Sequence, residues 1–147
     1  MVLPTALADV ALLIGRVLLG VLFIAHGWQK LFTNGVEGTS AFFGQMGVPM
    51  PTLAAWGAGL VELGCGAALV LGLLTPLAAL ALLLDMIGAY AFVHAGKGLF
   101  IEQGGFELVG ALGAGCLLLI ATGPGRYSVD SRLFTRRGIG DRPRVRA

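Results

Sequence analysis

The sequence predicts an all-α integral membrane protein, a four-helix bundle with a short interfacial helix in its first loop. Of the 147 residues, 56% are apolar and only 12% are charged, whereas soluble domains are typically about 25% charged. The mean hydropathy is +0.87, and a chain this short cannot cover so much apolar surface with its own polar groups, so lipid is the expected solvent. The long apolar segments also show no alternation of period two, which favours helices over barrel strands.

The four predicted spans cover residues 8–32, 52–74, 76–95 and 106–122, each near the roughly 20 apolar residues that a membrane helix needs. The N-terminus lacks the basic region of a signal peptide, so we expect the first span to be retained. Only "LTPLA" joins the second and third spans, and Pro76 suits the first turn of a helix, which predicts an antiparallel hairpin. Residues 1–125 are thus expected to form one domain, followed by an Arg-rich tail over residues 126–147.

The first loop contains the predicted interfacial helix. Residues 36–46 place Phe42, Phe43 and Met46 at helical spacing, and Pro49 and Pro51 end the segment. The third loop, "GKGLFIEQGG", is short and rich in glycine.

The distribution of basic residues predicts the topology. Seven of the ten Lys and Arg residues lie in the last 22 residues. Directly after a hydrophobic span, such a tail indicates a cytoplasmic flank drawn to anionic lipid headgroups, and no soluble nucleic-acid recognition fold accompanies it. With an even number of spans, both termini are expected on the cytoplasmic side of the cell membrane, with no nucleic-acid partner.

Ionisable residues inside the predicted spans are the candidate functional group. Arg16, His26 and Lys30 fall within roughly 80° of one another on a helical wheel, so this stripe can face the bundle interior while Leu18, Leu19 and Leu22 meet lipid. The other spans carry complementary groups: Glu62, Asp85, His94 and Glu107.

Depth along the helices predicts which of these groups meet. Counted from the cytoplasmic ends, Arg16 and Asp85 lie at a similar depth and can pair, while Glu62 is within reach of Arg16 or His26. Towards the outer face, His26, Lys30, His94 and Glu107 lie within about two helical turns of one another.

Two interpretations of this set compete. In the first, ion pairs only hold the helices in register; in the second, the ionisable cluster marks a proton, ion or ligand site. One pair would fix the register, and seven groups on four spans exceed that need, so the second is favoured. Within it, Arg16, Glu62 and Asp85 lie deepest. Lys30 and His94 also fit interfacial anchors, and Glu107 fits either a helix N-terminal acid or a site carboxylate.

Other chemistry has weaker support in the sequence. Cys65 and Cys116 come at a similar depth and can meet, but no C-x-x-C motif exists and Cys is also a common buried hydrophobe. His26 and His94 lack the close ligand spacing of a zinc site, so no metal is expected. No phosphate-loop pattern indicates a nucleotide.

The chain resembles the DoxX family of small four-helix membrane proteins. The similar pieces are "RVLLGVLFIAHGWQKL", "GAGLVELGCGAALVLGLLTPLAAL" and "GGFELVGALGAGCLLLIATGPGRYSVD". This resemblance implies an association with redox complexes and detoxification, since the family is named after membrane subunits linked to thiosulfate:quinone oxidoreductases. It points to Arg16, His26, Lys30, Glu62 and Glu107 as site residues, and any electron-transfer partner would be another polypeptide.

The expected function is therefore that of a membrane subunit of an oxidoreductase system. In this hypothesis the polar interior binds a quinone or a small anionic substrate, with Arg16 and Lys30 as positive partners and Glu62 or His26 handling protons. A second hypothesis is a non-catalytic assembly protein whose small-residue faces contact partner helices or a second copy of the chain, with a tail that recruits enzymes. A small transporter or channel component is the third, although no broken, duplicated helices point to it.

Overall fold

The computed structural model of the chain describes residues 5–135, which are helical and contain no β-strand. The α-helices in this part of the chain are α1 (Thr5–Trp28), α2 (Gly35–Gln45), α3 (Pro51–Leu71), α4 (Thr75–Ala89), α5 (Glu107–Thr122) and α6 (Val129–Thr135). A π-helical segment extends α1 (η1, Gln29–Thr33), another extends α4 (η2, Tyr90–His94), and a 3-10 turn, η3 (Ile101–Gln103), precedes α5. Most of the predicted Arg-rich tail, residues 136–147, lies outside the described residues.

Three helical stretches are long and apolar enough to cross a membrane: Thr5–Thr33, Pro51–Leu71 and Thr75–His94. The fourth predicted span is the apolar helix α5, which has 16 residues. At 1.5 Å per residue it measures about 24 Å, which is shorter than the roughly 30 Å hydrocarbon core of a bilayer. The helix expected over residues 36–46 is α2.

The predicted hairpin is present as α3 and α4. Gly72, at φ 70°, ends α3 in the left-handed conformation, and the Leu73 amide donates to the Ala68 carbonyl at 2.9 Å. Pro76 lies in the first turn of α4, where its missing N–H removes no helical hydrogen bond. Residues 72–76 therefore specify both the end of α3 and the start of α4.

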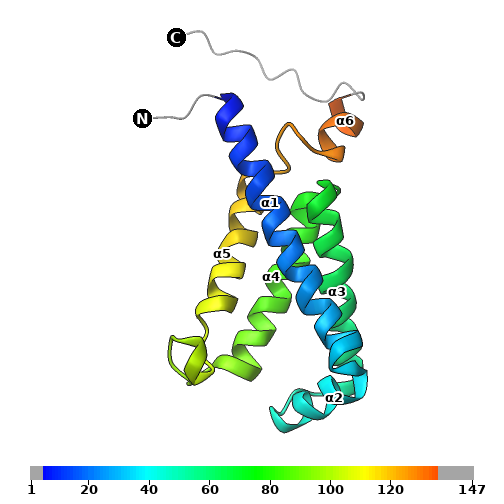
Figure 1. Ribbon diagram of the computed structural model, residues 1–147, viewed down its shortest axis with the longest axis vertical. Helices are drawn as coiled ribbons and strands as arrows, with labels where there is room; N and C mark the ends of the chain where they lie inside the picture. The colour runs from blue at the N-terminus through cyan, green and yellow to red at the C-terminus, as the bar shows by residue number, and fades with distance from the viewer. Residues whose placement is uncertain (1–4, 136–147) are drawn as a thin grey trace.

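Figure 1 shows that α1 crosses the α3–α4 hairpin and that α5 lies beside α4. The first turns of α1 project beyond the hairpin turn, at the same end of the molecule as α6, and α2 lies across the opposite end. The apolar core includes Phe23, Leu69, Leu82 and Cys116, one from each long helix and all at 0% exposure.

The outward faces of the helices are apolar, as lipid contact requires. Leu18, Leu22 and Leu84 are exposed on them. The prediction that Leu19 meets lipid is wrong, because this side chain is 9% exposed and belongs to the core. The buried stripe of α1 is wider than the three ionisable residues alone indicated.

Close contact between α1 and α3 depends on glycine. A Cβ atom at Gly66 would lie 2.9 Å from the Gly20 carbonyl oxygen, and one at Gly20 would lie 2.6 Å from the Gly66 carbonyl oxygen. Gly64, two residues earlier on α3, is instead exposed and has nothing within 4 Å of an added Cβ. The α1–α3 crossing therefore passes through Gly20 and Gly66.

We expect Gly66→Ala to lower the free energy of unfolding by about 1–3 kcal/mol, because the methyl group would press on backbone of α1. Gly64→Ala is the matched control on the same helix. It should leave stability unchanged or raise it by up to about 1 kcal/mol, since alanine favours the helix and the space is open. Unfolding of both variants in mixed micelles measures the difference, and equal effects would contradict a contact at Gly66.

Candidate functional site

Arg16 lies at the hairpin turn and not with the other predicted site residues. Its side chain is 1% exposed, and Nη2 donates to the Tyr127 carbonyl oxygen at 2.7 Å. The guanidinium packs against Gly72, where an added Cβ would overlap it. The charge therefore sits at the C-terminus of α3, the end of a helix that favours a cation.

Asp130 supplies the opposite charge, at the N-terminus of α4. Its carboxylate accepts hydrogen bonds from the Leu74 amide at 2.8 Å and the Thr75 amide at 2.9 Å, and it attracts Arg16 electrostatically. The Asp130 amide in turn donates to the Gly72 carbonyl oxygen at 3.0 Å. Arg16, Gly72, Tyr127 and Asp130 thus form a clasp that joins α1, the hairpin turn and the segment after α5.

The expected pairing of Arg16 with Asp85 or Glu62 is therefore wrong. The depth estimate assumed that α1 and the hairpin begin at one level, whereas α1 projects beyond the hairpin turn (Figure 1). Arg16 consequently lies level with Gly72, and Asp85 lies ten residues beyond Thr75 on α4, about 15 Å further along.

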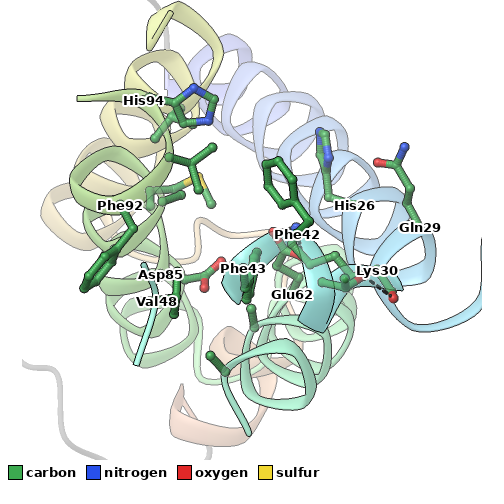
Figure 2. Close-up of a pocket in the computed structure, with 18 of the residues that line it drawn as sticks. His26, Gln29, Lys30, Phe42, Phe43, Val48, Glu62, Asp85, Phe92 and His94 are labelled. Atoms are coloured by element: carbon green, nitrogen blue, oxygen red, sulfur yellow. Dashed lines mark hydrogen bonds and ion pairs between the residues drawn. The ribbon is translucent and has the colours of Figure 1, made fainter. Parts of the chain in front are cut away.

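The other predicted residues gather around a pocket of about 890 Å³ in the half of the molecule that α2 covers. Figure 2 shows Lys30, Glu62 and Asp85 around its polar part, with Phe42, Phe43 and Phe92 along its walls. His26 and His94 also line it, as do apolar side chains of α5. Pockets of this size are typical of sites for small organic ligands.

An ion pair between η1, the extension of α1, and α3 forms the centre of the polar part. Lys30 Nζ donates to Glu62 Oε1 at 2.8 Å and to Oε2 at 2.7 Å. The side chain of Glu62 is 2% exposed and that of Lys30 is 23% exposed. Lys30 is therefore paired with a buried carboxylate of α3.

The position of Lys30 depends on local backbone structure. It lies in η1, where the Asn34 amide bonds back to the Gln29 carbonyl at 2.8 Å, five residues away. The buried Thr39 hydroxyl of α2 donates to the Lys30 carbonyl oxygen at 2.8 Å. The π-turn and α2 together therefore orient the ammonium group towards α3.

Asp85 adds a second carboxyl group to the pair. It is half-buried on α4, and its carboxyl group interacts with that of Glu62 and with the Lys30 ammonium. In Figure 2 it points from α4 into the space that Glu62 faces. One ammonium, hydrogen-bonded to Glu62, thus lies near two carboxyl groups that come from α3 and α4.

The remaining predicted residues have different surroundings. His94 Nδ1 lies 2.7 Å from the Gly104 carbonyl oxygen, and Glu107 accepts a hydrogen bond from the Ile101 amide at 2.8 Å without lining the pocket. Cys65 and Cys116 are both free thiols. Between residues 5 and 135, no group of three His, Cys, Asp or Glu side chains is arranged to hold a metal ion.

Sequence reasoning missed the site roles of several residues. Thr39, Tyr127 and Asp130 act through contacts that join distant segments. The usable signal was "GPGRYSVD", in which Asp130 follows a Pro- and Gly-containing stretch that cannot continue α5. Phe92 carried no signal, because an aromatic residue in an apolar span is ordinary.

Comparison with known proteins identifies the family. The DoxX family model matches residues 11–95. An uncharacterized membrane protein of Mycobacterium tuberculosis is 37% identical over 82% of this chain and 80% of its own length. Inner membrane protein YqjF of Escherichia coli is 35% identical over 86% and 95%, and "Putative oxidoreductase CatD" of Bacillus subtilis is 35% identical over 55% and 58%. No solved structure matches the sequence. The chain therefore belongs to the DoxX family and is an integral membrane protein.

Proposed function

We propose that this protein is the membrane-embedded ligand-binding subunit of a redox system, and that its pocket takes a quinone. The observation that carries this proposal is the Lys30–Glu62 pair with Asp85 beside it, inside a pocket that is otherwise mainly apolar and aromatic. A quinone has the matching chemistry, since its ring and tail are apolar and its carbonyl oxygens accept hydrogen bonds. One relative carries the name "Putative oxidoreductase CatD", which agrees with this class of function.

The polar groups support a proton-handling role. Reduction of a quinone to a quinol takes two electrons and two protons. In this proposal a partner oxidoreductase supplies the electrons. Asp85 delivers the two protons to the ring oxygens one after the other and is reprotonated from solvent each time, while Glu62 holds the Lys30 ammonium in place. The Lys30 ammonium donates a hydrogen bond to the oxygen on which negative charge develops. Arg16 has no part in this step, because it belongs to the clasp.

The proposed arrangement in the cell membrane is a four-span bundle with both termini in the cytoplasm. The clasp then lies at the cytoplasmic end and the pocket in the outer half, under α2, which rests at the outer interface. A cysteine placed at the exposed Glu37 of α2 should react with a membrane-impermeant thiol reagent added to intact cells. Labelling only after the cells are opened would reverse this orientation.

Quinone binding is expected to depend on Asp85. The purified full chain should bind menadione or a short-chain ubiquinone saturably, and Asp85→Leu should weaken the affinity by at least about tenfold, or 1.4 kcal/mol. This variant keeps the Lys30–Glu62 pair, and its thermal midpoint should stay close to that of the wild type. Titration of intrinsic tryptophan fluorescence measures the binding.

The matched control for this titration is Glu102→Gln, which neutralises an exposed carboxylate in η3 outside the pocket. It should bind as the wild type does. Absence of saturable binding to the wild type would refute the proposal. If partner enzymes still co-purified with the chain, that result would favour the assembly function instead.

A further inference from the structure

The charges that line the pocket do not balance. Lys30 is the one Lys or Arg among the described residues that line it, whereas Glu62 and Asp85 are both carboxylic acids. The ammonium neutralises one carboxylate, and Lys30 bonds both oxygens of Glu62. A second carboxylate in an apolar, membrane-embedded pocket is costly unless a proton or a cation accompanies it. Asp85 is therefore the group that needs a partner.

We propose that the pocket binds a lipophilic organic cation, such as an aryl phosphonium or a quaternary ammonium compound, in exchange for the proton on Asp85. The single bond that breaks is the Asp85 O–H bond: the cation enters, the proton passes to solvent water or buffer, and the net charge of the pocket is conserved. This binding rests on the pocket and its charges and does not depend on quinone chemistry.

The lining favours an organic cation over a metal ion. Phe42, Phe43 and Phe92 offer aromatic faces, which attract cations through their quadrupoles. Both oxygens of Glu62 are taken by Lys30, so Asp85 would be the single carboxylate free to hold a metal. A volume of about 890 Å³ also far exceeds that of a bare ion and suits a molecule with several rings or chains.

The groups around Asp85 define the expected pH dependence. Asp85 interacts with Lys30 of η1 and with Glu62 and Cys65 of α3. His26 of α1 and His94 of η2 line the same pocket. The parts of α2 and α5 that line the pocket contribute no charged side chain. If Asp85 gives up its proton, cation affinity rises with pH by up to about tenfold per unit while that proton is bound. Binding of a neutral quinone releases no proton, so the two ligands are distinguished by this measurement.

Calorimetric titration with tetraphenylphosphonium tests the proposal. The purified full chain in an uncharged detergent should bind it saturably, more tightly at about pH 8 than at about pH 6, with release of close to one proton per cation. Proton release is obtained from buffers of different ionisation enthalpy. Asp85→Asn should weaken binding at least about tenfold and remove its pH dependence.

The matched control is Glu37→Gln, which neutralises an exposed carboxylate of α2 that does not line the pocket, and it should bind as the wild type does. A thermal melt of Asp85→Asn close to that of the wild type shows that the variant is folded. Equal binding by Asp85→Asn, equal binding of neutral tetraphenylmethane, or competition by sodium at constant ionic strength would each overturn the proposal.

Discussion

Replacing Gly72 by alanine is expected to lower the free energy of unfolding by about 2–5 kcal/mol. Gly72 has φ 70°, where an L residue costs about 1–2 kcal/mol. The new methyl group would also overlap Arg16 Nη1 and lie 2.6 Å from the Ser128 Cβ, and forcing atoms into a packed site costs about 1–3 kcal/mol. Reversible unfolding in mixed micelles measures the loss.

Two controls separate the contributions to this loss. Gly35 has nearly the same φ, 71°, with nothing within 4 Å of an added Cβ, so Gly35→Ala should show the backbone cost alone. Arg16→Leu removes the guanidinium and its bond to Tyr127, and a hydrogen bond to a charged group is worth about 1.5–3 kcal/mol. Exposed Lys97→Leu should change stability by no more than about 0.5 kcal/mol.

In the Arg16→Leu background, Gly72→Ala should lower the free energy of unfolding by less than it does in the wild type, because the new methyl group no longer overlaps the guanidinium. This non-additivity is the signature of the clasp. Strictly additive effects, or equal stability of Arg16→Leu and Lys97→Leu, would show that the guanidinium does not hold the hairpin turn.

The long helices and α2 were predictable because each is defined by local sequence, whereas α6 lies where only a tail was expected. Apolar length sets the spans, and Pro76 after a short linker sets the hairpin. The clasp was not predictable, because it depends on how far α1 projects past the hairpin turn. No property of α1 alone fixes that offset: it follows from where Gly20 meets Gly66.

Of the seven predicted residues, five line the pocket and two, Arg16 and Glu107, do not. The pairing of Lys30 with Glu62 was not predicted. Glu62 and Asp85 stood out because carboxylic acids are rare in apolar spans. Lys30 looked like an interfacial anchor, since it lies near the end of a span. Its pairing with Glu62 depends on the π-turn η1 and on the Thr39 hydroxyl, and neither can be derived from helical spacing.

Neutralising both carboxyl groups of the pocket is expected to destabilise the protein far more than neutralising either one. With Glu62→Gln alone, Asp85 can still balance the Lys30 ammonium, so the cost should be about 1 kcal/mol, and Asp85→Asn leaves the ion pair intact. The double variant leaves the ammonium without a counter-charge, which typically costs about 3–5 kcal/mol. Unfolding of the wild type, the two single variants and the double variant in mixed micelles gives the coupling energy between Glu62 and Asp85. Additivity within about 0.5 kcal/mol would show that Asp85 does not balance the Lys30 ammonium when Glu62 is neutral.

A third change shows whether that loss comes from the charge or from altered packing. Adding Lys30→Met to the double variant removes the unpaired ammonium while keeping a side chain of similar length. Because no uncompensated charge then stays buried, the triple variant should regain most of the lost stability. A triple variant as unstable as the double one would mean that Glu62 and Asp85 support the fold by packing. The pair would then owe its presence to structure, and the unmatched carboxyl group would lose its significance for ligand binding.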